Sequence, residues 1–215
     1  MNQPPSQPAR RFVVGISGAS GAAYALRVLE QLLTGGHEVH LVVSEYGRRL
    51  LADEAGVRRL TTEDLLPGLA GLPAADRLII HPHKDVGAVI ASGSFLHDGM
   101  AVVPCSSATL GAMATGSGSN LLVRAAMVCL KERRPLIVCH RETPLNLIDI
   151  ENYRRLTLAG AIICPANPGL YLNPRSVQDL VDFVAGKVLD LLKAPHTLAT
   201  RWEEAAPPLI AEPED

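Results

Sequence analysis

The sequence predicts an α/β fold built on a parallel sheet of about six strands, and three observations support this prediction. The chain has 215 residues, which is the size of about one domain. Short apolar runs of β type alternate with segments of helical spacing, an alternation typical of parallel sheets. Glycine or hydroxyl residues directly follow several predicted strands. We expect one domain over residues 11–193, between tails at residues 1–10 and 194–215 in which proline and charge dominate.

The first two units of the chain each consist of a strand, a turn and a helix. Residues 12–16 form an apolar run that ends at a glycine-rich turn, and residues 22–33 follow with apolar side chains at helical spacing. The second strand, residues 39–43, ends at Ser44 and leads into a helix near residues 48–55. Each unit predicts a strand followed by a helix that crosses back over the sheet.

The rest of the chain continues this alternation after one interruption. Residues 66–83 are rich in leucine, glycine and proline and predict a helix and loop excursion. The remaining strands are predicted at residues 86–91, 100–104, 136–139 and 161–164. The remaining helices are predicted near residues 121–131, 146–159 and 176–192.

Charge and composition exclude several classes of function. Twenty basic and 22 acidic residues give a net charge of −2, and aromatic residues are only 4% of the chain. Neither a basic surface nor stacking rings are available for a nucleic-acid partner. No apolar run approaches the ~18 residues of a spanning helix, so we expect no membrane partner and a cytoplasmic protein. The four cysteines form no C-x-x-C pair and are expected to be buried, reduced thiols.

The turn from Gly15 to Gly21 is the first candidate binding element. In open parallel sheets, ligands bind outside the carboxyl ends of the strands, where this turn is expected to lie. Its glycines permit a close approach of the backbone, and its amides precede a helix, where an anion is favoured. The turn is not G-x-G-x-x-G and lacks the Walker A lysine, so it suits a phosphate or a flavin edge. A plain tight turn is the alternative.

Hydroxyl residues follow three other predicted strands. They are Ser44, the Ser92-Gly-Ser94 segment and the run from Ser106 to Thr109. Each could be only the N-cap of a helix. Three such strand ends in one sheet favour a shared cofactor that carries a phosphate.

Several further residues permit two interpretations. Lys131 and its basic neighbours follow a predicted helix, where cations are common. Glu142 could accept a proton at a strand end or form an ordinary salt bridge. His81 and His83 lack a third ligand, so we expect no zinc site. Cys105 resembles a nucleophile at a strand end, but no histidine can be assigned as its base, and a buried thiol is expected.

Seven motifs occur in an order and spacing that resemble the flavin prenyltransferase (UbiX) family. They are Gly15-Ile-Ser-Gly-Ala-Ser-Gly21, Ala91-Ser-Gly-Ser94, Pro104-Cys-Ser106, Ala114-Thr-Gly116, Leu130-Lys-Glu-Arg-Arg-Pro135, Arg141-Glu-Thr-Pro144 and Pro168-Gly-Leu-Tyr171. The resemblance spans about residues 11–192, and the run from residue 131 to 144 is its most specific part.

The resemblance implies a Rossmann-like, flavodoxin-like three-layer fold, a homododecamer, and FMN bound at subunit interfaces without a metal. It implies transfer of a dimethylallyl group from dimethylallyl monophosphate to N5 and C6 of reduced FMN, with release of phosphate. The product, prenylated FMN, serves UbiD-type decarboxylases. Two alternatives are an FMN-dependent cysteine decarboxylase-like flavoprotein and a non-catalytic FMN-binding subunit of an aromatic acid decarboxylase.

The resemblance also implies roles for individual residues. The implied FMN contacts are Gly18, Ala19, Ser20, Ser44, Ser92, Cys105, Ser106, Ser107, Ala108, Thr109 and Arg124. Ser20, Glu54 and Glu142 are implied to handle protons, and the substrate phosphate is implied to contact Lys131, Arg141, Tyr171 and Lys187. The sequence departs from the family pattern at Lys187, where arginine is usual, and at His140, where an aliphatic or small residue is expected. Lysine supplies a charge without the planar fork of arginine, and simple exposure on a helix surface is the alternative for Lys187.

Overall fold

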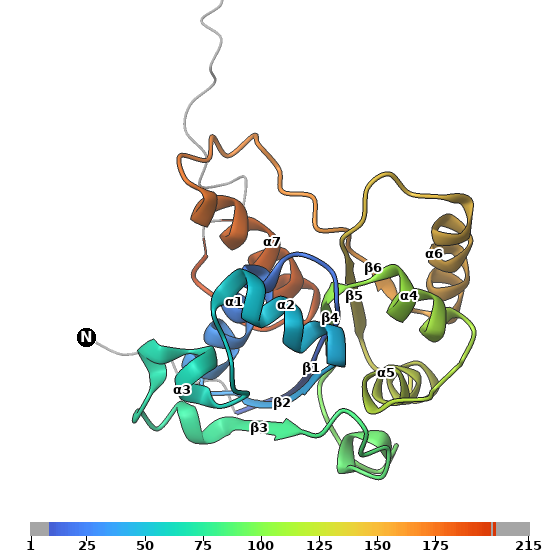
Figure 1. Cartoon of the computed structure of the whole chain (residues 1–215), viewed down its shortest axis with the longest axis horizontal. Helices are drawn as coiled ribbons and strands as arrows, with labels where there is room; N and C mark the ends of the chain where they lie inside the picture. The colour runs from blue at the N-terminus through green and yellow to red at the C-terminus, as the bar shows by residue number, and fades with distance from the viewer. Residues whose placement is uncertain (1–8, 199, 201–215) are drawn as a thin grey trace, which may run out of the picture.

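The structure is a computed structural model that describes residues 9–198 and residue 200, and its centre is a six-stranded parallel sheet (Figure 1). The strands lie in the order β3-β2-β1-β4-β5-β6. Their bounds are β1 Arg11–Ile16, β2 Glu38–Val43, β3 Leu78–His81, β4 Met100–Cys105, β5 Leu136–His140 and β6 Ile162–Ile163. The helices are α1 Ala22–Thr34, α2 Glu45–Ala55, α3 Thr62–Leu65, α4 Ser107–Ala114, α5 Leu121–Lys131, α6 Leu147–Ala159 and α7 Val177–Leu191, with short 3₁₀ helices η1 Pro67–Leu69, η2 Ala75–Arg77 and η3 Val89–Ala91. The predicted Rossmann-like, flavodoxin-like α/β fold is confirmed.

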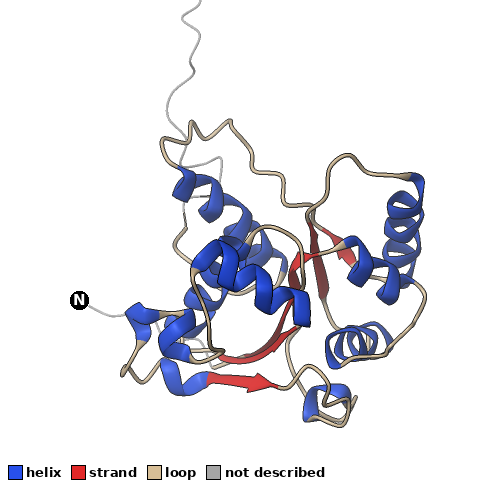
Figure 2. Cartoon of the chain, viewed as in Figure 1, coloured by secondary structure: helices blue, strands red, loops and turns tan. Residues whose placement is uncertain are grey.

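Helices cover both faces of the sheet, which gives the three layers seen in Figure 2. Phe12 and Val14 of β1 belong to a buried cluster that also contains residues of α1 and α7. Val13 and Val102 belong to a second cluster, with residues of α4 and α5. Successive side chains of a strand point to opposite faces, so burial on both sides requires strands that are apolar along their whole length. That requirement explains the continuous apolar runs in the sequence.

The prediction of a strand at residues 86–91 is wrong. Within this run, Val89–Ala91 forms the 3₁₀ helix η3, whose Ile90 is buried against the cluster around α5. The strand β3 instead occupies Leu78–His81, inside the segment expected to be helix and loop. A short apolar run does not by itself distinguish a strand from a helical turn, and β3 is a four-residue edge strand with only half-buried side chains.

The strand order reverses between β1 and β4. β1 pairs with β2 on one side and with β4 on the other, both in parallel. Ligands of open α/β sheets bind at such a reversal, outside the carboxyl ends of the strands. The segments that begin there are residues 17–21, after β1, and residues 106–109, after β4.

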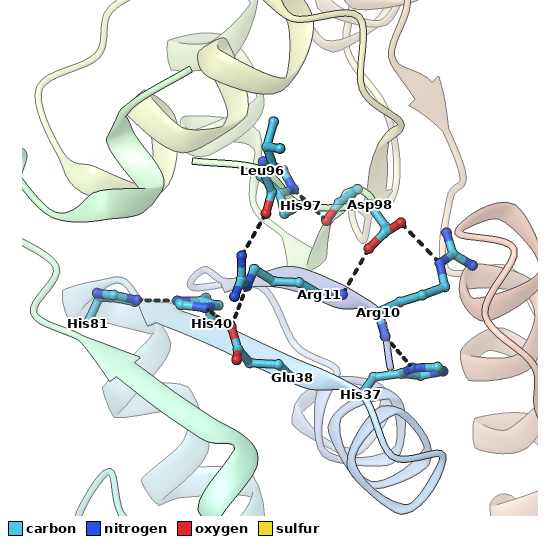
Figure 3. A network of polar contacts seen from close by, with 10 residues as sticks. Arg10, Arg11, His37, Glu38, His40, His81, Leu96, His97 and Asp98 are labelled. Atoms are coloured by element: carbon cyan, nitrogen blue, oxygen red, sulfur yellow. Dashed lines mark hydrogen bonds and ion pairs between the residues drawn. The ribbon is translucent and has the colours of Figure 1, made fainter. Parts of the chain in front are cut away.

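A chain of polar contacts lies near the opposite, amino edge of the sheet (Figure 3). Glu38 accepts hydrogen bonds from Arg11 and from Nε2 of His40, the latter at 2.8 Å. His40 Nδ1 lies 2.8 Å from His81 Nε2, and the two rings stack with centroids 5.1 Å apart. His81 therefore pairs with a histidine of β2. Over residues 9–198 no three histidine, cysteine or acidic side chains gather in a way that could hold a metal ion.

Residues beyond α7 continue to pack against the domain. Ala194 and Leu198 are buried in the same cluster as α1 and α7. Most of the two expected tails, namely residues 1–8, 199 and 201–215, lies outside the described residues. Of the helices that the structure describes, none is both long and apolar enough to cross a membrane.

Candidate active site at the carboxyl edge of the sheet

A buried serine ties the ends of β1 and β4 together. The Ser17 hydroxyl is fully buried, donates to the carbonyl of Pro104 at 3.2 Å and accepts a hydrogen bond from the backbone nitrogen of Ser106 at 2.8 Å. These bonds fix the two loops at the strand reversal relative to each other. The sequence analysis did not select Ser17, although its position as a hydroxyl directly after a strand is the same signal that selected Ser44.

The loop after β4 presents hydroxyl groups and helix-start amides. Ser106 is the N-cap of α4, and its Oγ accepts a hydrogen bond from the Thr109 nitrogen at 3.3 Å. Ser107 and Ala108 follow in the first turn, where amides have no partner within the helix. Cys105 is fully buried, and burial raises the pKa of its thiol. The thiol is therefore part of the core. The backbone amides and hydroxyls of this loop are the groups that can bind an anion.

The turn after β1 is packed closely against the start of α2. A Cβ atom at Gly18 would lie 2.4 Å from Cβ of Tyr46, so this position excludes a side chain. Gly21 has a φ of 128°, a conformation that favours glycine. Ser44 is the N-cap of α2 and accepts from the nitrogen of Gly47 at 3.0 Å. Its side chain therefore has the structural role that the sequence analysis left open, at the same edge as the turn.

Glu54, near the end of α2, reaches the start of α1. Its Oε2 atom accepts hydrogen bonds from the backbone nitrogens of Gly21 and Ala22, both at 2.9 Å. Burial alone would raise the pKa of Glu54. The hydrogen bonds from the Ser20 side chain and the two amides, with the charge of Arg141, outweigh burial and lower that pKa. Ser20 thus donates to Glu54, and Arg141 lies near enough for its charge to act on this carboxylate.

Arg141 places a cation directly after β5. Its backbone nitrogen donates to the carbonyl of Cys105 at 3.2 Å, which fixes the loop beside the end of β4. Its side-chain Nε is buried and has no hydrogen-bond partner among the described residues. A buried N–H without an acceptor is costly, and an anionic ligand would supply one. This guanidinium is therefore suited to bind a phosphate.

Glu142 is the next residue and extends into solvent. Its Oε1 atom accepts a hydrogen bond from the backbone nitrogen of Thr143 at 3.0 Å. Glu142 forms no ion pair with any residue in the described ranges, so the ordinary salt bridge considered from the sequence is not observed. An exposed carboxylate at this edge remains available to a ligand.

Tyr171 packs against α7 one turn before Lys187. The ring of Tyr171 meets Phe183 of α7 edge to face, with centroids 5.8 Å apart. Phe183 and Lys187 are four residues apart and therefore lie on one face of the helix. Burial raises the pKa of Cys164, just after β6, and the charge of Lys187 opposes that rise, which places the lysine near this strand end. In Figure 1 the loop before α7 runs from the β5 and β6 end of the sheet across to the start of α7.

The structure does not bring Lys131 and Ser92 to this edge. Arg124 lies in the first turn of α5, near the carboxyl edge, whereas Lys131 ends the same helix about 10 Å farther along. Lys131 is paired with Glu132 and lies beside Gly93, the neighbour of Ser92. These residues precede β4 and β5, so they lie toward the amino edge. Within one chain they are separate from Glu54 and Arg141.

The fold and this site define a flavoprotein. The model of the family described as Flavoprotein matches residues 2–189. The flavin prenyltransferase UbiX of Halalkalibacterium halodurans is 42% identical over 197 residues, which cover 90% of this chain and 93% of that protein. The chain belongs to the flavin prenyltransferase (UbiX) family and is a transferase.

Two solved structures extend the similarity to three dimensions. The crystal structure of AnUbiX (PadA1) in complex with FMN and dimethylallyl pyrophosphate is 38% identical, with a TM-score of 0.78 over 86% of this chain and 93% of that one. A dodecameric FMN-dependent UbiX-like decarboxylase from Escherichia coli O157:H7 is 36% identical, with a TM-score of 0.79 over 89% of this chain and 98% of that one.

Proposed function

We propose that this chain transfers a dimethylallyl group from dimethylallyl monophosphate to N5 and C6 of reduced FMN, releases phosphate and requires no metal. The prenylated FMN serves UbiD-type decarboxylases in the cytoplasm. The observation that carries the proposal is the meeting of Glu54, Ser20 and Arg141 at the strand reversal. An ionised carboxylate with a hydroxyl partner lies there within electrostatic reach of a cation whose buried N–H has no acceptor among the described residues.

The loops after β1 and β4 suit the flavin and its phosphate. Hydroxyls and first-turn amides from Ser106 to Thr109 can donate to a phosphate oxygen, and Arg124 adds a positive charge from the start of α5. The turn at Gly18 allows the ring system to approach the backbone. FMN supplies the nucleophilic atoms of the reaction.

Protons and the leaving phosphate are handled by separate groups of side chains. Glu54 is kept ionised by its amide donors and exchanges a proton with Ser20. The exposed Glu142 accepts a proton from the reacting substrates. Arg141 binds the leaving phosphate, with Lys187 and Tyr171 beside it. These cations and the phenol stabilise the charge that develops on the phosphate.

We propose further that complete sites form between subunits of a homododecamer. Helix α6 exposes four large apolar side chains, Leu147, Ile148, Ile150 and Leu158. Such exposed apolar faces are typical of protein–protein contacts. Lys131 and Ser92, which lie away from the rest of the site in one chain, reach it from a neighbouring subunit. The dodecameric UbiX-like decarboxylase from Escherichia coli supports this assembly.

Phosphate release under anaerobic conditions tests the proposed reaction. The chain is incubated with dimethylallyl monophosphate or dimethylallyl pyrophosphate, each with and without reduced FMN. We expect phosphate from the monophosphate, or pyrophosphate from the pyrophosphate, to be released only in the presence of reduced FMN, and faster from the monophosphate. Ser106→Ala and Arg124→Ala are expected to weaken FMN binding in a titration. If neither substrate releases its leaving group, the proposed prenyltransferase activity is contradicted. That result would favour a non-catalytic flavin carrier or a cysteine decarboxylase.

A further inference from the structure

His140, the last residue of β5, is buried between two hydroxyl groups. Its side chain is only 1% exposed. Nε2 lies 3.1 Å from Oγ of Ser107, and Nδ1 lies 2.7 Å from the hydroxyl of Tyr153 on α6. The two rings meet edge to face, with centroids 5.4 Å apart. A continuous polar chain therefore runs from α6 through the end of β5 to the start of α4, at a position where the sequence departs from the UbiX pattern.

The two hydrogen bonds determine which nitrogen of His140 carries the proton. Burial lowers the pKa of His140, so the ring is neutral and has a single N–H. Burial raises the pKa of Tyr153 to about 12, so the phenol keeps its proton. Nδ1 is the hydrogen-bond partner of that phenol within the described residues, and an O–H left without an acceptor is costly. Tyr153 therefore donates to Nδ1, and Nε2–H donates to Ser107.

This direction of donation orients the Ser107 hydroxyl. Because its oxygen accepts a hydrogen bond from His140, the hydroxyl hydrogen points away from the imidazole and is available to another acceptor. Ser107 is the first residue of α4 and follows the N-cap Ser106. A hydroxyl donor beside first-turn amides is suited to a phosphate oxygen.

We propose that His140 is a positioning residue for the flavin phosphate. It holds the Ser107 hydroxyl as a donor toward that phosphate, and Tyr153 holds His140 in the tautomer that this requires. Ser107 makes the contact and His140 acts through it. The inference rests on the proposed function, because it places the phosphate of FMN at the loop after β4.

Parallel titrations with FMN and with riboflavin, which lacks the phosphate, test this role. His140→Leu removes the donor and keeps apolar bulk, so FMN affinity should fall about five- to tenfold, the usual effect of one neutral hydrogen bond. Riboflavin affinity should not change. Ser107→Ala removes the phosphate contact itself and should lose at least as much affinity, and the double variant should lose no more than Ser107→Ala alone, because His140 acts only through that hydroxyl.

Two conservative variants separate positioning from simple packing. His140→Gln retains a side-chain N–H for Ser107 and should recover most of the FMN affinity. Tyr153→Phe leaves the histidine in place but no longer determines which ring nitrogen carries the proton. This variant should lose part of its affinity for FMN. Additive losses in the double variant, equal weakening of FMN and riboflavin, or a His140→Gln variant as weak as His140→Leu would overturn the proposal. Thermal unfolding shows whether each variant is folded, and Tyr153→Phe provides the test should His140→Leu fail to fold.

The same titrations distinguish failure of this inference from failure of the proposed function. If the unmodified chain binds FMN no more tightly than riboflavin, the proposed phosphate site is wrong, and the role of His140 fails with it. If the unmodified chain prefers FMN and Ser106→Ala abolishes that preference while His140→Leu retains it, only the role of His140 is wrong.

Discussion

The Oε2 atom of Glu54 lies 2.9 Å from the backbone nitrogen of Gly21, although 33 residues separate them in the sequence. Gly21 is the N-cap of α1 and offers no side chain to satisfy the first amides of that helix, so the carboxylate of α2 does so. The start of α1 and the end of α2 are thereby joined at the edge where the flavin is proposed to bind.

Glu54→Gln should fold and bind FMN but lose most of its prenyl transfer. The amide oxygen can still accept from the two backbone amides, whereas the negative charge that exchanges a proton with Ser20 is lost. Acid–base groups typically contribute about 10²–10⁴-fold in rate. Single-turnover formation of prenylated flavin is the measurement. A rate equal to that of the unmodified chain would show that Glu54 only caps helix α1 and does not take part in the reaction.

Lys187→Ala should raise the concentration of dimethylallyl monophosphate needed for half-maximal rate about tenfold or more, as expected for loss of a charge-assisted contact. FMN affinity should be unchanged, because Lys187 acts on the end of β6, whereas the flavin phosphate is proposed to bind at the loop after β4. Lys187→Arg is the matched control and should retain or improve substrate affinity, since a guanidinium also binds phosphate. If the affinities for FMN and for dimethylallyl monophosphate fall equally, or if neither falls, Lys187 does not belong to the substrate site.

Mixed oligomers should show that Lys131 and Glu142 act in one site from different chains. Lys131→Ala and Glu142→Gln are each expected to be inactive, and co-expression should restore about a quarter of the activity, because random mixing completes that share of interfacial sites. Glu54→Gln mixed with Glu142→Gln is the control and should restore nothing, since both residues belong to one chain's edge. Recovery in neither mixture would show that Lys131 and Glu142 act from the same chain.

Acid should destabilise the domain through His97. Burial lowers the pKa of His97 to about 4 from 6.5, against the hydrogen bond to the carbonyl of Gly99, which acts in the other direction. The unfolded chain therefore binds more protons below pH 6.5, and the free energy of unfolding falls as the pH decreases from 6.5 toward 4. Between pH 7 and pH 5 this group alone should cost about 2 kcal/mol.

Denaturant unfolding at pH 7 and pH 5 checks this expectation. His97→Gln keeps a possible donor for the Gly99 carbonyl but does not titrate, so its stability should change less between the two pH values. The variant should retain some dependence on pH, because burial also lowers the pKa values of His40 and His81. A pH dependence identical to that of the unmodified chain would show that His97 takes up its proton at the same pH in the folded and the unfolded chain.

Much of the fold follows from local patterns in the sequence. The helix predicted at residues 121–131 has these bounds in the structure, and Asn120 caps it. The helices predicted from residues 146 and 176 begin at Leu147 and Val177, directly after the N-caps Asn146 and Ser176. Each N-cap forms a capping box with an aspartate three residues later. Where a capping residue directly precedes apolar residues at helical spacing, the neighbouring sequence alone determines where the helix begins.

Other elements depend on contacts that the sequence does not display. The edge strand β3 forms because residues 78–81 pair with β2, and η3 forms because Ile90 packs under α5. Helix α4 consists largely of small residues and starts at the cap of Ser106, so its apolar period is weak. In the candidate site, the contact of Glu54 with Gly21 and the burial of Arg141 Nε join distant segments. Motif resemblance selected these residues, and the tertiary structure explains why they meet.

The mass of the flavin recovered from the protein tests the central claim most directly. The chain is incubated anaerobically with reduced FMN and dimethylallyl monophosphate, and the flavin is extracted and analysed by mass spectrometry beside a Glu142→Gln sample. The account predicts an increase of one five-carbon prenyl unit with the unmodified chain and little or none with the variant. Flavin of unchanged mass from a chain that has bound FMN would contradict it.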